Sequence, residues 1–190
     1  MGDVNYLKRL IDSGGSVFRV DDLGKIWGIK DNNYLRVLIS RMLKREDLVA
    51  ISRGLYSYKN EWNLWELGNK YKRPSYISLE SVLFKEGVIF QDYSRTVTCV
   101  SNNSLRKSIA GVDLVYSKIR EEILTNPLGI VNEKGVVRAT RERAIGDMIY
   151  LSPNFYFDNQ DWWDKEMLLK IGRIYNNKRV EKELVKLCLT

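Results

Sequence analysis

The sequence contains no histidine. Histidine is the commonest general base near neutral pH, so its absence removes Ser-His and Cys-His nucleophile pairs and His-ligated metal sites. The chain also lacks a Walker A sequence, and it has no G-x-G-x-x-G sequence after an expected strand. No arrangement of carboxylates or lysines points to catalysis instead. We therefore expect a protein that is not an enzyme and that needs neither a cofactor nor a metal ion.

Cysteines and long apolar runs are also scarce. The two cysteines, Cys99 and Cys188, have neither the spacing of a metal site nor that of a disulfide framework. Isolated cysteines are usually small buried hydrophobic residues. No apolar run approaches the roughly 18 residues that a membrane helix needs, and the first residues, MGDVNYLKRLIDSGG, contain no signal-peptide core. We expect a cytoplasmic protein with no membrane partner.

What the sequence does have is a moderate excess of basic residues. Its 190 residues carry a net charge of +7, from 31 Lys and Arg against 24 Asp and Glu. The excess is denser near the start, where residues 1–60 hold 11 basic and 7 acidic side chains. Such an excess indicates an anionic partner such as nucleic acid. The length allows one large domain or two small ones.

Residues 1–60 predict a winged helix-turn-helix DNA-binding domain. Apolar residues at helical and at strand spacing give, in chain order, helices over 3–11, 21–28 and 31–45 and strands over 48–52 and 55–59. Asp21 and Asp31 are expected to cap the second and third helices, and Arg53-Gly54 to turn the hairpin. Two helices joined by a short turn and followed by a hairpin form the winged version of the motif.

The rest of the chain predicts a mixed α/β domain over 75–190, after a connecting helix or linker over 61–74. The expected elements begin with a helix from a Ser78 cap to Gly87, strands over 96–101 and 112–119, and two short strands around Lys134-Gly135 within 129–140. A helix from a Thr140 cap that stops before Pro153, an aromatic loop over 154–166, and helices over 164–175 and 178–189 follow. The predicted fold class is therefore α+β, with an N-terminal winged helix-turn-helix followed by a mixed α/β domain that ends in helices.

The helix over 31–45 is the predicted recognition helix. In a helix-turn-helix the second helix enters the major groove with its N-terminal part at the base edges. That part contains Val37 and the candidate base-reading residues, which are Asn32, Asn33, Arg36 and Ser40, because Asn can pair with adenine and Arg with guanine. Further along the helix, the phosphate candidates are Arg41, Lys44 and Arg45. A solvated basic face and a winged helix that binds protein are the open alternatives.

Other basic residues are weaker candidates. Arg53 at the hairpin tip either serves the turn alone or reaches a phosphate or the minor groove, and Ser16 and Arg19 are further phosphate candidates. A second basic patch, for nucleic acid or another anion, would consist of Arg106, Lys107, Arg138, Arg141 and Arg143; the alternative is solvated charge. The loop around Trp162-Trp163 is either a structural plug or an exposed protein-binding patch.

A resemblance to the AbiEi family covers roughly residues 15–190. The winged helix of that family is similar to the stretch VFRVDDLGKIWGIKDNNYLRVLISRMLKREDLVAISRGLYSY, and its C-terminal antitoxin domain is similar to SYISLESVLFKEGVI followed by GVVRATRERAIGDMIYLSP. Two motifs carry the second match. They are an S-x-x-S-A-L-x-x-x-G-like entry at Ser78, Ser81, Val82, Leu83 and Gly87, and an A-T-x-E-R-A-like helix start at Ala139 to Ala144.

The resemblance implies an antitoxin that is also a transcriptional repressor, from a bacterial abortive-infection toxin-antitoxin pair used in phage defence. Members of the family bind inverted repeats in their own promoter, as double-stranded DNA, through the winged helix. The C-terminal domain counters a nucleotidyltransferase-like toxin, generally without a stable complex. The alternative is a winged-helix module that acts by direct complex with a partner protein.

Overall fold

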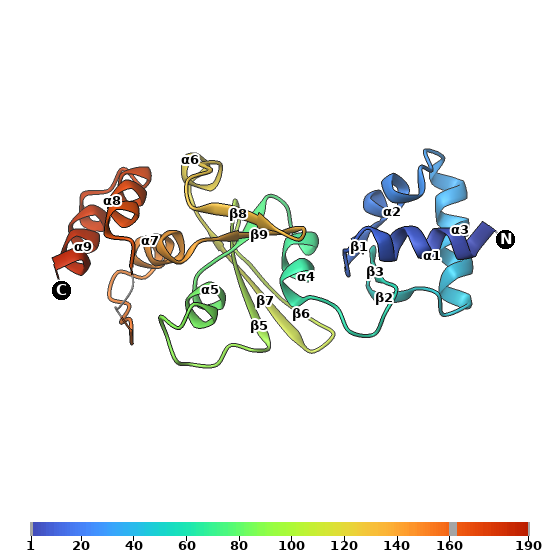
Figure 1. Ribbon diagram of the computed structural model, residues 1–190, viewed down its shortest axis with the longest axis horizontal. Coiled ribbons are helices and arrows are strands. Elements are labelled where there is room, and N and C mark those ends of the chain that lie inside the picture. The colour runs from blue at the N-terminus through green and yellow to red at the C-terminus, as the bar shows by residue number, and fades with distance from the viewer. Residues whose placement is uncertain (1, 160–162, 190) are drawn as a thin grey trace. The chain divides into compact units, whose positions relative to one another are not determined.

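A computed structural model describes residues 2–159 and 163–189 of the chain (Figure 1). The protein is a mixed α+β protein, as the order of expected elements predicts. Its contacts divide it into two compact units, which meet in the chain between Tyr71 and Lys72. Within the described residues, no helix has both the length and the apolar composition that crossing a bilayer requires.

The first unit consists of helices and a small antiparallel sheet. Its elements are α1 (Gly2–Asp12), β1 (Phe18–Arg19), α2 (Val20–Trp27), α3 (Asn32–Lys44), β2 (Val49–Ser52), β3 (Leu55–Ser57) and α4 (Leu64–Tyr71). The three strands lie in the order β1-β3-β2. The predicted three helices and hairpin are confirmed within one or two residues.

The core of the first unit lies between its helices and the start of the hairpin. Its buried members come from α1, β1, α2, α3 and the residue before β2, and they are Leu10, Phe18, Leu23, Trp27, Leu35, Leu38, Ile39, Met42 and Leu48. Each fully buried side chain of this kind contributes about 1.5–3 kcal/mol from the area it removes from water. One side of α3 is therefore held against the core, and its other side faces solvent.

Helix caps explain where α2 and α3 begin. The Asp31 carboxylate accepts hydrogen bonds from the backbone N–H of Asn33 and Tyr34, at 2.7 and 3.0 Å, which confirms the predicted cap of α3. The predicted cap at Asp21 is wrong. The structure starts α2 earlier, with Arg19 at the N-cap, because β1 passes directly into the helix and Asp22 accepts from the Arg19 N–H at 3.0 Å.

The second unit is a six-stranded mixed sheet with helices. Its elements are β4 (Ser75–Ile77), α5 (Glu80–Lys85), β5 (Thr96–Ser101), β6 (Leu105–Ile109), β7 (Val112–Lys118), α6 (Glu121–Leu124), β8 (Ile130–Glu133), β9 (Val136–Ala139), α7 (Arg141–Leu151), α8 (Lys165–Ile174) and α9 (Lys178–Leu189). The strand order is β6-β7-β5-β4-β9-β8, with β5/β7 and β4/β9 parallel and the other pairs antiparallel. In Figure 1, β5 and β7 are the long strands of this sheet.

Most predicted elements of this unit are present, and Thr140 caps α7 as expected, accepting from the Arg143 N–H. The sequence did not predict β4, β6 or α6. The predicted cap at Ser78 is wrong, because Leu79 occupies the N-cap of α5 and the Ser78 hydroxyl donates to Asp147 instead, at 2.8 Å. Cys99 is a buried core residue of β5, as predicted, and its burial raises the pKa of the thiol.

Candidate nucleic-acid interface

The exposed side of α3 brings the predicted base and phosphate candidates together. Asn32, Asn33, Arg36, Ser40, Arg41, Lys44 and Arg45 are all exposed. The apolar residues on the opposite side of the helix are buried in the core, and they are Leu35, Leu38, Ile39 and Met42. The 13 residues of α3 span roughly 20 Å, at about 1.5 Å per residue. This is a helix face long enough to follow several base pairs in a groove that is about 12 Å wide.

Helical spacing gives this face a centre line and two flanks. Asn33, Val37, Ser40 and Lys44 follow one another at steps of four, three and four residues, so they form one stripe along the helix. That stripe lies opposite the buried side. Arg36 and Arg41 lie on its two sides. A helix placed in a groove with this stripe towards the base edges would have one arginine on each side of the stripe, where a long side chain can reach a base edge or a phosphate.

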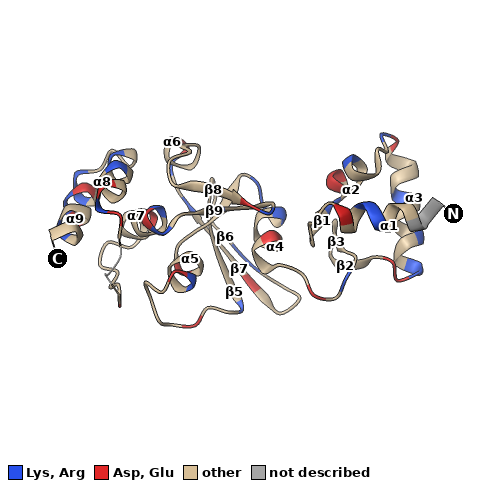
Figure 2. Ribbon diagram, in the orientation of Figure 1, with Lys and Arg blue, Asp and Glu red and all other residues tan. Residues whose placement is uncertain are grey.

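The charge of α3 has one sign. Figure 2 shows basic positions along α3 and no acidic ones, and acidic residues reappear only at Glu46 and Asp47. Arg45 is paired with Asp47 at 3.4 Å. In the part of the chain that the structure describes, no ion pair involves Arg36 or Lys44. Their charges are therefore available to an anionic partner.

A close approach of α2 and α3 fixes the position of this face. Gly24 of α2 is buried, and a Cβ atom at that position would lie 3.2 Å from Cδ2 of Leu35 and 3.3 Å from the carbonyl oxygen of Ile29. Both contacts are tighter than ordinary packing allows. Gly28 ends α2, as the expected bounds of 21–28 predict, and its backbone lies in the left-handed region, at φ 71°. The short connection over 28–31 then sends the chain into α3.

Two lysines that the sequence did not single out lie beside the start of α3. A hollow of about 400 Å³ opens between the end of α2 and the first turn of α3. Its exposed lining includes Lys25, Lys30 and Asn32, and its buried lining includes Gly24 and Leu35. Lys30 lies in the turn itself, just before the Asp31 cap. This position in the motif is the only local feature of the sequence that could have marked Lys30 as a candidate for contact with an anion.

Arg53 lies at the turn between β2 and β3 and is exposed. Gly54 takes φ 80°, so the glycine provides the backbone conformation that the turn requires. In the described residues Arg53 makes no ion pair. Its side chain is not needed to hold the hairpin, and it stays a candidate for contact with an anion.

The two weaker phosphate candidates of the first unit have structural roles. Ser16 is buried, and its backbone N–H and hydroxyl both donate to the Glu66 carboxylate of α4, at 2.6 and 3.0 Å. The expectation that Ser16 contacts a phosphate is therefore wrong, because its donors are already used. Arg19 is half-buried, and its Nη1 donates to the carbonyl of Lys70 at 3.2 Å.

The prediction that Arg143 belongs to a basic surface patch is also wrong. Its side chain is fully buried and forms an ion pair with Asp147 at 3.2 Å, between Nε and Oδ1. Its Nη1 donates to the carbonyl of Leu128 at 2.8 Å, and its Nη2 to that of Ile123 at 2.6 Å. A charge held in this way is closed to an outside ligand.

Asp147, the partner of Arg143, accepts several hydroxyl hydrogen bonds. Tyr76, Ser78 and Tyr175 donate to it at 3.0, 2.8 and 2.7 Å. Burial raises the pKa of the Asp147 carboxyl, while the Arg143 charge and these hydroxyl donors act in the opposite direction. Burial and the nearby carboxylate also raise the pKa of both tyrosines, which keeps them protonated as donors. Because the acceptors and donors of this network satisfy one another, we interpret it as a structural feature.

The remaining members of the predicted patch do not come together. Arg106 and Lys107 are exposed on β6, whereas Arg138 lies on β9, with three strands between them. At about 4.8 Å per strand this is a separation of roughly 19 Å. Arg138 is paired with Glu86 and Glu133 at 3.2 and 2.8 Å, and Arg141 with Glu142 at 3.2 Å. Arg106 and Lys107 therefore do not form one basic patch with Arg138 and Arg141, and the latter two arginines already have acidic partners.

The aromatic loop has both buried and exposed members. Trp163 is largely buried, and its ring meets that of Phe157 edge-on, with centroids 6.0 Å apart. Tyr156 is 75% exposed. Trp162 lies outside the described residues. Trp163 is thus a packing residue, as the structural-plug interpretation expects.

Two further findings bear on function. Among the described residues, no group of three or more cysteines and carboxylates could hold a metal ion. Comparison with protein-family models gave no match, and a search of curated proteins gave none either. The resemblance to the AbiEi family therefore depends on the motifs quoted from the sequence, and the interface on the geometry of α3.

Proposed function

We propose that the protein is a DNA-binding autorepressor and the antitoxin of a bacterial abortive-infection toxin-antitoxin pair. The observation that carries the DNA-binding part is the exposed face of α3. This face is rich in Asn, Arg and Lys, contains no acidic residue, and is backed by a packed core. These are the side chains that recognise base edges and phosphates.

The order of elements in the first unit supports a winged helix-turn-helix. Helices α2 and α3 are joined by a short connection, and the hairpin β2–β3 follows. In this motif the second helix enters the major groove and the hairpin forms the wing. Arg53 at the hairpin turn would then contact a phosphate or the minor groove beside the site of α3.

The proposed binding separates affinity from specificity. Arg41, Lys44 and Arg45, near the end of α3, contact phosphates and release counterions, which makes affinity fall steeply with salt. Near its start, Asn33 and Arg36 pair with base edges and set the preferred sequence. Two copies on an inverted repeat would place two α3 helices in successive major grooves, about 34–36 Å apart.

The antitoxin part of the proposal comes from the resemblance of the second unit to the AbiEi family. The helix start that carries it, Ala139 to Ala144, contains Thr140, the N-cap of α7, and Arg143, the buried partner of Asp147. These residues hold the unit together. In the resembling family this domain counters a nucleotidyltransferase-like toxin, and we propose the same role here.

The DNA-binding proposal is tested with the duplex of the protein's own promoter region. Fluorescence anisotropy would measure the affinity of the full chain for that duplex and for a shuffled duplex of equal composition, at 50 and 200 mM salt. We expect tighter binding to the promoter at both salt concentrations, and a loss of affinity with salt for both duplexes. Equal affinity for the two duplexes would contradict a repressor.

The antitoxin proposal is tested by co-expression. We expect the adjacent gene to encode a nucleotidyltransferase-like protein that stops growth when expressed alone and that is harmless when the full chain is expressed with it. A matched control is a chain with Arg36→Ala and Lys44→Ala, which should lose promoter binding and keep its protection. Growth arrest that the full chain does not relieve would contradict the antitoxin role.

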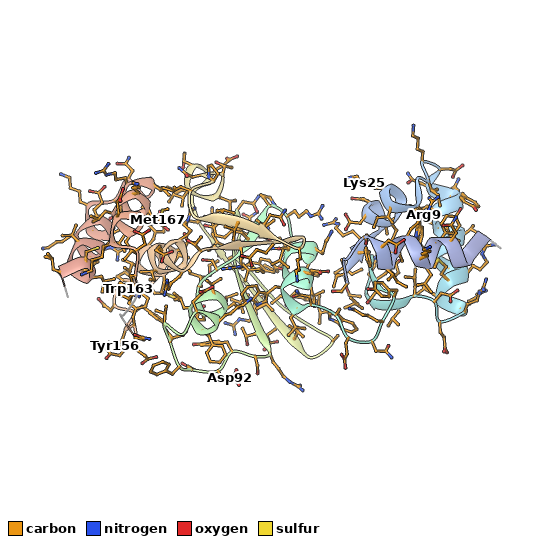
Figure 3. All side chains as sticks on the ribbon, in the orientation of Figure 1. Arg9, Lys25, Asp92, Tyr156, Trp163 and Met167 are labelled. Atoms are coloured by element: carbon orange, nitrogen blue, oxygen red, sulfur yellow. The ribbon has the colours of Figure 1, made fainter. Side chains whose placement is uncertain are left out.

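A second candidate function is a module that acts by direct complex with a partner protein. One observation favours it. Phe90 and Tyr156 are 69% and 75% exposed, and their loops are tied together by a hydrogen bond from the Phe90 N–H to Asp158 at 2.8 Å. Figure 3 shows Tyr156 at the periphery of its loop. Co-purification of a stable toxin complex that Tyr156→Ala weakens would favour this function.

A further inference from the structure

Val37 is the most exposed large apolar side chain of α3. Its exposed fraction is 63%, and it stands on the centre stripe between Asn33 and Ser40. The other large apolar side chains of the helix, apart from Tyr34 at 46%, lie in or against the core of the first unit. Val37 is thus an apolar interruption of an otherwise polar face.

Neither folding nor helix stability calls for a valine at this position. With most of its surface in water, the side chain gains little from burial. A β-branched residue also loses rotamer freedom in a helix, so alanine or a longer polar residue would stabilise α3 slightly more. Packing within the chain therefore does not explain a valine at position 37, whereas a contact with a partner would.

We infer that Val37 reads the methyl group of a thymine and so favours an A·T pair at one position of the DNA site. This inference rests on the proposed DNA-binding function. In the major groove, the C5 methyl of thymine is the one apolar group among the hydrogen-bonding groups of the base edges. A short apolar side chain flanked by Asn33 and Ser40 on the same stripe is complementary to it.

Tyr34 is the alternative apolar contact, because it lies one turn before Val37 and is also exposed. Its position on the helix differs. Spacing places Tyr34 beside Arg41, towards one edge of the exposed face, whereas Val37 lies on the stripe itself. A tyrosine hydroxyl at such an edge suits a phosphate oxygen. We therefore expect Val37 to contact the methyl group of a base and Tyr34 to contact the phosphate backbone of the DNA.

The test removes the thymine methyl without changing base pairing. A preferred duplex is first selected with the full chain from a random library. Each thymine of that duplex is then replaced singly by deoxyuridine, and affinities are measured for the original chain and for Val37→Ala. For the original chain, we expect one replacement in each half-site to weaken binding about fourfold, the effect of removing one buried methyl group from contact. For Val37→Ala, we expect that replacement to have no effect.

Two control variants make the result specific. Ile11→Ala removes a β-branched side chain that is 52% exposed on α1, and Tyr34→Ala removes the neighbouring ring. Both should keep the full sensitivity to deoxyuridine. The inference is overturned if no replacement weakens binding, if Val37→Ala keeps the sensitivity, or if Tyr34→Ala is the variant that loses it. A selection that enriches no sequence would instead overturn the proposed function itself, and the inference with it.

Discussion

Helices α3 and α7 look alike in sequence and differ in what their arginines do. Both are short helices that carry two arginines among apolar residues, but α3 buries one side, whereas α7 buries every residue from Glu142 to Ile149. In α3 the arginines are exposed along a face without acid, whereas in α7 Arg143 is fully buried and bound by a carboxylate, a hydroxyl and carbonyl groups. The two helices therefore differ in whether an arginine charge is available: Arg143 is held inside its unit, whereas Arg36 is exposed and makes no ion pair within the described residues.

The largest expected effect comes from breaking the buried pair of α7. Arg143→Ala leaves the buried Asp147 carboxylate without its ion-pair partner, and it removes the guanidinium that donates to the carbonyls of Ile123 and Leu128. Removing one partner of a buried ion pair typically destabilises a protein by about 3–5 kcal/mol. We expect the free energy of unfolding of the second unit to fall by that amount, measured by urea denaturation followed by circular dichroism.

The matched control for this change is Arg141→Ala, two residues earlier on the same helix. Arg141 is paired with Glu142, and their side chains are 28% and 11% exposed, whereas those of Arg143 and Asp147 are 0% exposed. Because water reaches the Arg141 pair in part, we expect Arg141→Ala to lower the free energy of unfolding by less than Arg143→Ala does. If both variants unfolded at the same urea concentration, the distinction between the fully buried and the partly exposed arginine would fail within α7 itself.

On α3 the corresponding change should affect binding and leave stability nearly unchanged. Arg36→Ala removes an exposed side chain that we expect to pair with a base edge, at about 1–3 kcal/mol of discrimination. Affinity for the promoter duplex should fall more than affinity for a shuffled duplex, by fluorescence anisotropy. Arg106→Ala, which removes an equally exposed arginine from β6, serves as the control and should change neither. An equal loss for both duplexes would make Arg36 a phosphate contact instead.

Lys44 tests the other half of the α3 face. Because a lysine near the end of the helix is expected to hold a phosphate, Lys44→Ala should weaken binding to both duplexes about equally. The slope of log affinity against log salt should become shallower by about 0.9, the value for one phosphate contact. Lys8→Ala removes the same charge from α1 and should leave the slope unchanged. A loss of affinity for the promoter duplex alone would instead indicate that Lys44 contacts a base edge.

The smallest expected effect concerns a pair on the sheet of the second unit. Two hydrogen bonds from Arg138 hold the pKa of the exposed Glu133 carboxyl below its usual range. A folded-state pKa below the unfolded one means that the pair stabilises the fold above the unfolded pKa. That contribution disappears as pH falls through the folded value. NMR titration of Arg138→Gln should raise the Glu133 pKa towards that of an ordinary glutamate, and an unchanged pKa would show that Arg138 does not control it.

Local signals predicted most of the first unit. Apolar residues at helical spacing and a short capping side chain act within a few residues, so the bounds of α3 and its Asp31 cap could be derived from the sequence. The start of α2 was missed because its cap depends on the strand that precedes it. The stripe through Val37 follows from helical spacing once the buried side of α3 is known. From the sequence, however, we assigned contact roles only to the polar residues of the helix and gave Val37 none.

The second unit depends more on contacts between distant residues. Strand β6 escaped prediction because Leu105, Arg106, Lys107 and Ser108 are all exposed, which leaves no alternation of apolar and polar residues. Arg143 was placed on the surface because Tyr76 and the carbonyls of Ile123 and Leu128 come from far away in the chain. The one local signal was Asp147, four residues after Arg143, between apolar neighbours.

The most direct test of the central claim asks which basic residues of the whole chain meet DNA. Full-length protein labelled with ¹⁵N would be titrated with the promoter duplex while its amide and arginine side-chain signals are followed. We expect the largest changes on α3, from Asn32 to Arg45, and at Arg53, while the signals of Arg138, Arg141 and Arg143 keep their positions. Changes centred on these three arginines or on Arg106 and Lys107, with α3 unaffected, would exclude α3 as the DNA-binding face.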